Sequence, residues 1–206
     1  MMQLYTSTTT PFGRKVAVFG AELGLSDQLD PVLTDPWGDD SLRQFNPLGK
    51  IPVLVREDGS TLFESALICE YLAGLAGERG AALLPTAGAA RIATLRQQAL
   101  ADGILGGGVA RLVETRRPED KRHPPWVARQ EKAISGGIAL LDGEASAGGL
   151  PTGVATLGAC AVGACLGWID FRHPDIDWRA EAPSLKSWFA AFAERESMRA
   201  TVPFQA

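Results

Sequence analysis

The sequence predicts an α/β domain followed by an all-helical domain. Short strand and helix patterns alternate through the first 77 residues, whereas only helical patterns separated by Gly and Pro follow residue 85. The composition of residues 78–85 predicts a linker between the two parts. We therefore expect one domain over residues 1–77 and a second over residues 86–206.

The first domain is predicted to run strand, helix, strand, helix, strand, strand, helix. The elements are expected at residues 2–6, 13–24, 28–32, 41–45, 51–56 and 61–63, with a last helix from residue 65. Asp58-Gly59 predicts a hairpin between the third and fourth strands, because this dipeptide suits a type I′ turn. A βαβ unit followed by a ββα unit is the order of a thioredoxin-like fold.

Four helices are predicted in the second domain, each bounded by Gly or Pro. They are expected at residues 90–114, 124–141, 155–171 and from residue 183 onward. The segment 155–171 is rich in Ala and Gly and almost free of charge, so it should form the buried centre of this domain. Glycines 106–108 lack the pattern of a phosphate-binding loop and indicate close approach of a neighbouring helix, subunit or ligand.

Composition and charge argue against nucleic acids and membranes as partners. The chain carries 20 Lys+Arg against 24 Asp+Glu, whereas phosphate binding needs a concentrated positive field. The basic cluster between residues 111 and 122 is interrupted by carboxylates and is predicted to be a solvated helix end. No apolar run approaches the length of a membrane span, so a cytoplasmic protein is expected.

The cysteines and histidines point to neither a metal site nor a catalytic thiol. Cys69, Cys160 and Cys165 lie in apolar surroundings and are predicted to be buried and unpaired in a reducing compartment. None has the spacing of metal ligands, and His123 and His173 each precede a proline, as turn residues do. We expect no metal.

The most informative segment lies between the first strand and the first helix. Thr10-Pro11-Phe12-Gly13 stands where a thioredoxin-like fold carries Cys-x-x-Cys, and both cysteines are missing. Unpaired N–H groups and the helix dipole favour negative charge at this point. If the site is active, its thiol must come from a bound ligand.

Four segments make the chain resemble the cytosolic glutathione S-transferases over essentially its full length. They are residues 10–16, 46–54, 63–72 and 166–172, and the last is similar to a group of small bacterial members. The resemblance implies that glutathione is bound by Phe12, Lys50, Ile51, Pro52, Glu64 and Ser65.

The resemblance also implies a role for each part of this site. Pro52 would be the cis-proline that leaves the Ile51 backbone free to pair with the cysteinyl part of glutathione. Glu64 and Ser65 would hold the γ-glutamyl end, although Ser65 could instead be a plain helix N-cap. Lys50 would meet the glycine carboxylate, or could be a solvated turn lysine.

The catalytic hydroxyl has two candidates. Thr10 aligns with the Ser or Cys directly before Pro-Phe in some classes of the family, and Thr9 with a serine two residues before the proline in others. A hydrogen bond donated to the glutathione thiolate would lower the thiol pKa. Either threonine could instead only cap the helix.

The leading functional interpretation is a detoxifying glutathione transferase, in which glutathione attacks an electrophilic, partly apolar co-substrate. A glutathione-dependent disulfide or peroxide reductase is an alternative, as is a non-catalytic binding protein with the same fold. A homodimer is expected from the resemblance and from the glycine run 106–108.

Overall fold

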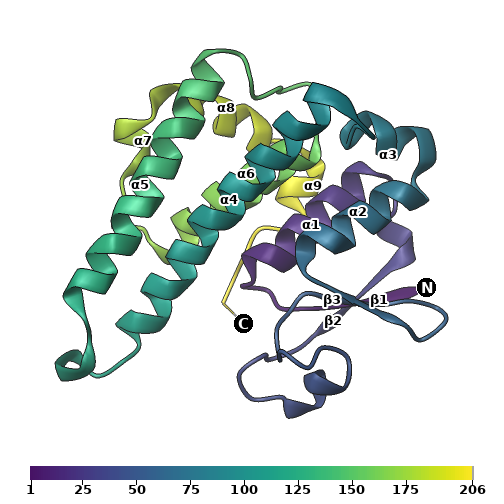
Figure 1. The fold of residues 1–206 in the computed structure, drawn as a ribbon, viewed down its shortest axis with the longest axis horizontal. Coiled ribbons are helices and arrows are strands. Elements are labelled where there is room, and N and C mark those ends of the chain that lie inside the picture. The colour runs from purple at the N-terminus through teal and green to yellow at the C-terminus, as the bar shows by residue number, and fades with distance from the viewer. Residues whose placement is uncertain (206) are drawn as a thin grey trace.

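The computed structural model describes residues 1–205 and has the two predicted parts, a small sheet with helices followed by a helical half (Figure 1). The sheet has the strand order β2-β1-β3-β4, with β1 parallel to β2 and antiparallel to β3, and β4 antiparallel to β3. Its strands are β1 (Met2–Thr6), β2 (Leu29–Leu33), β3 (Val53–Val55) and β4 (Thr61–Phe63). Helices α1 (Pro11–Glu22) and α2 (Ser65–Leu75) lie together on one face of this sheet (Figure 1). The thioredoxin-like order is confirmed.

The hairpin between β3 and β4 is confirmed, but its predicted type I′ turn is wrong. Such a turn needs positive φ at both central residues. In this loop Gly59 alone has positive φ, at 79°, and its N–H donates to the Arg56 carbonyl at 2.9 Å. The chain therefore closes with a three-residue loop that ends in a left-handed glycine.

The helical half contains the four predicted helices and several short elements that the sequence did not indicate. Its helices are α4 (Gly88–Thr115), α5 (Pro124–Ser146), α6 (Leu157–Arg172), α7 (Trp178–Glu181), α8 (Pro183–Ala193) and α9 (Glu196–Arg199). Four-residue helices such as α7 and α9 are too short to show a helical period. Among the residues described, none after β4 forms a strand, and no helix has both the length and the apolar character of a membrane span.

Four short helical segments lie between the larger elements. α3 (Gly77–Leu83) occupies most of the segment 78–85 predicted as a linker, and the boundary between two folding domains there stays a prediction. The helix predicted over residues 41–45 is a 3-10 turn, η2 (Asp40–Gln44). Two further 3-10 turns are η1 (Ser26–Gln28) and η3 (Glu119–Lys121).

Helix α6 is the buried centre of the helical half, as predicted. It packs against α1 and α4, and its N-cap Thr156 accepts the N–H of Ala159 at 3.2 Å. A Cβ atom at Gly108 of α4 would lie 2.6 Å from the Trp168 ring, so glycine is required where α4 and α6 cross. Gly107 faces α5, while Gly106 is open, so two of the three glycines serve packing within the chain.

Buried charges join the two halves. Lys15 on α1 is fully buried, and its Nζ lies 2.7 and 2.8 Å from the carboxylate oxygens of Asp102 on α4. Glu22, near the end of α1, accepts hydrogen bonds from Arg195 at 2.8 Å and from Ser197 at 2.5 Å. These contacts fix α1 against α4 and α9.

The Lys15–Asp102 pair should contribute strongly to stability. Asp102→Ala leaves the Lys15 ammonium buried without a counter-charge, so we expect the free energy of unfolding in urea to fall by about 3–5 kcal/mol. Arg199→Ala, which breaks the exposed pair with Glu194, is the control and should cost less than about 1 kcal/mol. A loss of similar size in both variants would contradict this role for the buried pair.

Candidate functional site

The strand register brings the three predicted site segments to one end of the sheet. Tyr5 of β1 lies opposite Val53 of β3, and Val53 lies opposite Phe63 of β4. Because β3 runs antiparallel to both neighbours, the ends of β1 and β4 meet the beginning of β3. The segments 7–10, 50–52 and 64–65 therefore follow or precede neighbouring strands at the same end.

The threonine segment forms the N-terminus of α1. Thr10 is the N-cap and Pro11 the first helical residue; the Thr10 hydroxyl oxygen accepts the N–H of Gly13 at a long 3.5 Å. Because a hydroxyl can donate while it accepts, this cap leaves the Thr10 proton available for a ligand. The Thr9 carbonyl accepts a hydrogen bond from Trp168 Nε1 at 3.0 Å, which ties this loop to α6.

Gly13 is required by the packing of the same loop. A Cβ atom at this position would lie 2.1 Å from the Thr6 hydroxyl oxygen and 2.5 Å from the Thr10 methyl group. A side chain here would displace the two threonines that flank the start of α1.

The charges around the start of α1 favour an anion. No acidic residue lies in its first turn, and Arg14 is buried without a carboxylate in salt-bridge distance among residues 1–205. The Arg14 guanidinium donates instead to the Thr201 hydroxyl at 3.3 Å and the Met198 carbonyl at 3.1 Å. Burial lowers the pKa of Arg14 to about 10, which leaves it protonated at neutral pH. Its charge adds to the positive end of the helix dipole.

The second segment is the turn before β3. The peptide bond between Ile51 and Pro52 is cis, as the resemblance implied, and Pro52 is buried. The Asn46 side chain holds the turn, because its Nδ2 donates to the Lys50 carbonyl at 2.8 Å and its Oδ1 accepts the N–H of Leu48 at 3.1 Å. The Lys50 side chain itself is exposed.

The third segment contains an unusual backbone conformation. Glu64 has a φ of 74°, which a non-glycine residue adopts at a cost of about 1–3 kcal/mol. Its Oε1 accepts the N–H of Ser65 at 2.8 Å and the Ser65 hydroxyl at 3.3 Å. The alternative of Ser65 as N-cap is therefore wrong: Glu64 caps α2, and the buried Ser65 is its first helical residue.

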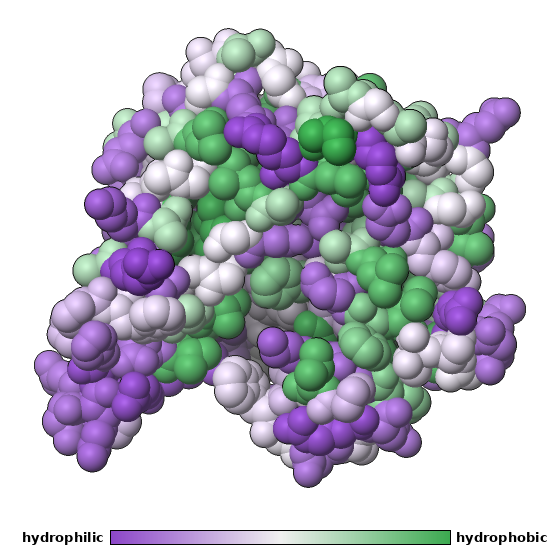
Figure 2. Space-filling model, viewed as in Figure 1, coloured by the Kyte–Doolittle hydropathy of each residue, from purple (hydrophilic) through white to green (hydrophobic). Residues whose placement is uncertain are grey.

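A hollow in the molecular surface lies between the helical half and the α/β half. Figure 2 shows this hollow between the lower ends of α4 and α5 and the α/β half, with both hydrophobic and hydrophilic residues around it. Phe12 of α1, Leu112 of α4 and Phe171 of α6 are only partly buried. The surroundings of the threonine loop are therefore partly apolar.

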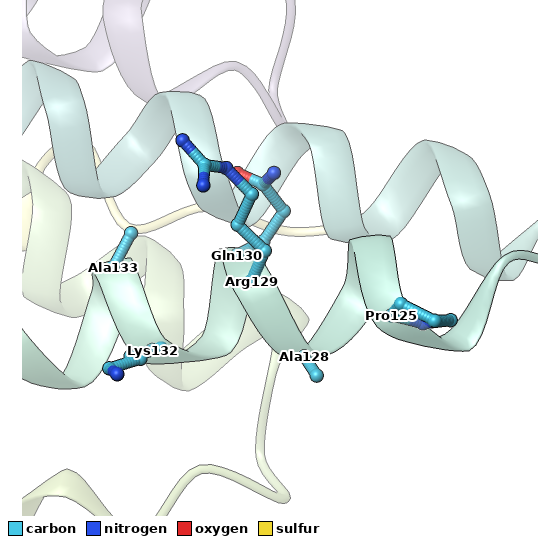
Figure 3. Close-up of a pocket in the computed structure, with 6 residues that line it drawn as sticks. All are labelled: Pro125, Ala128, Arg129, Gln130, Lys132 and Ala133. Carbon is cyan, nitrogen blue, oxygen red and sulfur yellow. The ribbon is translucent and has the colours of Figure 1, made fainter.

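A separate open hollow of about 830 Å³ lies on α5 and contains no predicted site residue. Figure 3 shows the six residues that line it, Pro125, Ala128, Arg129, Gln130, Lys132 and Ala133. All come from one helix, so a ligand there would be held from one side only.

The cysteines are buried and unpaired, as predicted. Burial raises the pKa of Cys69 to about 12 and that of Cys160 and Cys165 above the ordinary thiol value. Thiols of this kind are unreactive at neutral pH. Within the described part of the chain, no three His, Cys, Asp or Glu side chains are grouped so that they could hold a metal ion.

Sequence reasoning missed the roles of Arg14, Lys15 and Trp168. Two adjacent cations in an apolar helix with no acidic neighbour could have indicated distant partners. Trp168 lies inside one of the resemblance segments, but no pattern in the sequence indicates that its indole N–H meets the Thr9 backbone.

Two family models match the chain. The model of the glutathione S-transferase N-terminal domain matches residues 9–75, and that of the C-terminal domain matches residues 124–191. An uncharacterized GST-like protein of Escherichia coli K12, YibF, is 32% identical over 203 residues, which cover 98% of each chain.

Solved structures resemble the whole chain. A glutathione transferase family member from Pseudomonas fluorescens Pf-5, solved with bound glutathione, has 34% identity and a TM-score of 0.93, and each chain is covered completely. A glutathione S-transferase from Methylobacillus flagellatus KT, also with glutathione bound, has 34% identity and a TM-score of 0.90, covering 99% of this chain and all of that one.

Proposed function

The chain belongs to the glutathione S-transferase family, and we propose that it is a transferase that binds glutathione and activates its thiol. One observation carries this proposal: the threonine loop, the cis-proline turn and the Glu64–Ser65 pair lie at one end of the sheet. In the proposed reaction the glutathione thiolate attacks an electrophilic carbon of a partly apolar co-substrate.

The proposed thiolate lies at the start of α1. Thr10 donates its hydroxyl hydrogen to the sulfur, or failing that Thr9 does. The free N–H groups of the helix and the unpaired charge of Arg14 favour the thiolate over the thiol. The chain's own cysteines cannot take this part, because all three are buried.

The proposed peptide contacts follow the same three segments. Oε1 of Glu64 accepts both bonds from Ser65, so Oε2 remains for the ammonium of the γ-glutamyl end. The Ser65 hydroxyl turns from its long 3.3 Å bond with Glu64 to donate to the carboxylate, together with the next free N–H groups of α2. Ile51, which precedes the cis bond, pairs with the cysteinyl part of glutathione. Lys50 reaches the glycine carboxylate, and Phe12 is the remaining residue proposed to contact glutathione.

Two experiments separate this function from its alternatives. Retention on immobilised glutathione distinguishes glutathione-dependent proteins from a non-catalytic binding protein. Conversion of an aryl halide, compared with reduction of a mixed disulfide, then distinguishes a transferase from a reductase. The unpaired thiols suit a reducing compartment such as the cytoplasm, where we place the protein.

Replacement of the catalytic hydroxyl should raise the pKa of bound glutathione. A hydrogen bond to a charged group contributes about 1.5–3 kcal/mol, so Thr10→Val should raise the thiol pKa by about one to two units. Ultraviolet titration of the thiolate in the complex measures this shift, with Thr9→Val as the matched control. A shift in Thr9→Val alone would assign the role to Thr9, and a bound thiol that titrates like free glutathione in the wild type would contradict activation.

Loss of the γ-glutamyl contacts should weaken glutathione binding and leave the fold intact. Glu64→Gln removes the counter-charge of the ammonium, and Ser65→Ala removes a donor to the carboxylate, so we expect affinity to fall at least about tenfold in each. Titration calorimetry measures the affinity, and Ser135→Ala on α5 is the control. An unchanged affinity in Ser65→Ala would show that this segment does not bind glutathione.

A homodimer is proposed in addition. Gly106 is open, and Ile92, Ala99 and Gly103 lie exposed on the same side of α4, so a second copy could approach this helix closely. Sedimentation equilibrium at micromolar concentration should give twice the chain mass, and Gly106→Trp should shift the equilibrium toward the monomer. A single-chain mass for the wild type would refute the dimer.

A further inference from the structure

Arg172 lies on the side of α6 that faces the threonine loop. It follows Trp168 by four residues, so the two side chains share one face of the helix. Trp168 donates to the Thr9 carbonyl from this face at 3.0 Å. The Arg172 side chain therefore starts one turn beyond Trp168, on the face of α6 that meets the threonine loop.

The end of the chain connects Arg172 with the same loop. The N–H of Phe204 donates to the Thr8 carbonyl at 3.4 Å, and Oε1 of Gln205 accepts from Arg172 Nη1 at 3.1 Å. Phe204 and Gln205 are adjacent residues, so the backbone of one and the side chain of the other connect the Thr8 carbonyl with the Arg172 guanidinium. Figure 1 shows this end of the chain beside the start of α1. Phe204 is 58% exposed and adds apolar surface there.

The Arg172 guanidinium is only partly satisfied within residues 1–205. No carboxylate of the described chain forms an ion pair with it, and its Nε is buried without a hydrogen-bond partner. The group stacks on the Phe171 ring, 4.4 Å from the ring centre, and its one hydrogen bond goes to the neutral amide of Gln205. A guanidinium has further donors in a planar fork that fits a carboxylate.

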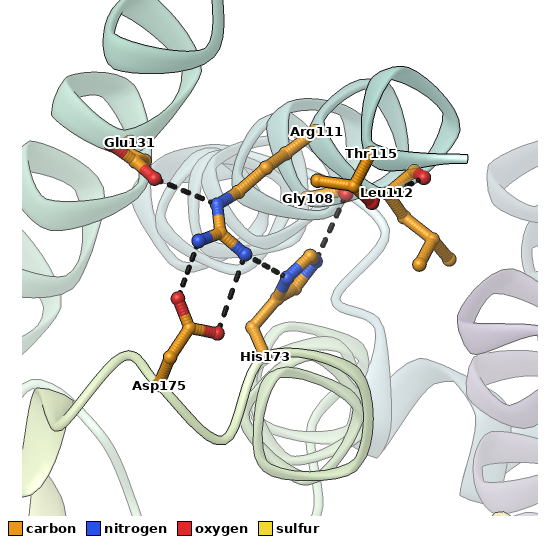
Figure 4. A network of polar contacts seen from close by, with 7 residues as sticks. All are labelled: Gly108, Arg111, Leu112, Thr115, Glu131, His173 and Asp175. Carbon is orange, nitrogen blue, oxygen red and sulfur yellow. Dashed lines mark hydrogen bonds and ion pairs between the residues drawn. The ribbon is translucent and has the colours of Figure 1, made fainter. Parts of the chain in front are cut away.

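The carboxylates on the elements around Arg172 form ion pairs with other arginines. Figure 4 shows Arg111 of α4 bound to Glu131, at 2.9 Å, and to Asp175. The same guanidinium lies 2.8 Å from Nδ1 of His173, whose Nε2 lies 3.0 Å from the Gly108 carbonyl oxygen. Because arginine can only donate, His173 accepts at Nδ1 and donates from Nε2.

The remaining acid of α6, Asp170, is bound by Arg179 at 2.5 and 2.7 Å. Arg116, which caps the C-terminus of α4, has no ion-pair partner in the described part of the chain either. Burial and the like charge of Arg116 lower the pKa of Arg172, as expected for two cations that lie near each other. Within residues 1–205, the C-terminal ends of α4 and α6 thus each carry an arginine without a carboxylate partner.

We propose that Arg172, supported by Arg116, binds a carboxylate on the co-substrate, so that the preferred electrophiles are anionic. The carboxylate lies on the guanidinium, and the apolar body of the molecule lies in the hollow toward Thr9 and Thr10. This inference rests on the proposed transferase function. With an aryl chloride, the glutathione sulfur forms a bond to the ring carbon, and chloride leaves with the bonding electron pair.

The test uses two electrophiles that differ in one substituent, a carboxylate in the first and a neutral amide in the second. A chloronitrobenzoate and the corresponding chloronitrobenzamide, each with chlorine para to the acid or amide carbon, are compared at saturating glutathione after subtraction of the uncatalysed rate. We expect Arg172→Gln to lower the ratio of kcat/KM for the benzoate to that for the benzamide at least about tenfold. Arg116→Gln should lower this ratio less than Arg172→Gln does. Arg172→Lys keeps a positive charge and should retain part of the preference for the benzoate.

Two control variants separate the effect of the Arg172 charge from the effect of the C-terminal residues and from the effect of the protein's net charge. Gln205→Ala removes the hydrogen bond of the tail but keeps the guanidinium, so the preference for the benzoate should remain. Arg199→Gln removes one exposed positive charge outside this cluster and should leave the ratio unchanged. Loss of the preference in either control would overturn the assignment to Arg172.

Binding measurements keep the inference separate from the proposed function. The two glutathione conjugates, made chemically, are titrated into the wild type and Arg172→Gln alongside glutathione. Preference for the carboxylate conjugate that disappears in the variant supports the inference, even if neither electrophile is turned over and the transferase function fails. Equal affinity of both conjugates for the wild type overturns it, as does weaker binding of glutathione itself to the variant, which would place Arg172 in the glutathione site.

Discussion

The buried Lys15–Asp102 ion pair is the constraint on which the arrangement of the two halves depends. An ammonium that is fully buried must keep its counter-charge, because an unpaired charge in the interior costs several kcal/mol. The pair fixes α4 against α1, and α6 fills the space beside both helices. Gly108 lets the Trp168 ring approach α4, and from that position the indole N–H holds the Thr9 carbonyl. A charge in the core thus positions the loop that carries the proposed catalytic hydroxyls.

The electrostatics of the site come from charges that the protein leaves partly unbalanced. Arg14 is buried near the start of α1 with only neutral acceptors in hydrogen-bond contact, and Arg172 is stacked on Phe171 with a neutral amide. Desolvating a cation in this way opposes folding, and a buried cation of this kind is a candidate for anion binding. In the proposed reaction, the charge of Arg14 would favour a thiolate beside Thr10, and the charge of Arg172 would bind a carboxylate on the molecule that the thiolate attacks.

The regular elements were predictable because their signals are local. Alternation over residues 2–6 gave β1, and the apolar spacing from residue 65 gave α2. Errors arose where a local pattern has two solutions of similar energy. Asp58-Gly59 fits more than one hairpin loop, and the loop found uses a left-handed conformation at Gly59 alone. Glu64 takes the capping position that Ser65 could have filled, at a φ of 74° that no sequence pattern indicates.

The sequence by itself determined the order of the longer elements, the absence of a cysteine at the start of α1 and the residue types available for binding glutathione. These features depend on short-range periodicity, on turn-forming residues and on the position of a short motif between the first strand and the first helix. Only the tertiary structure decided that Lys15 pairs with Asp102, that Trp168 meets Thr9 and that the end of the chain joins Thr8 to Arg172. Such partners lie 33 to 196 positions apart in the sequence, and their meeting depends on how helices cross and which carboxylates other arginines have already bound.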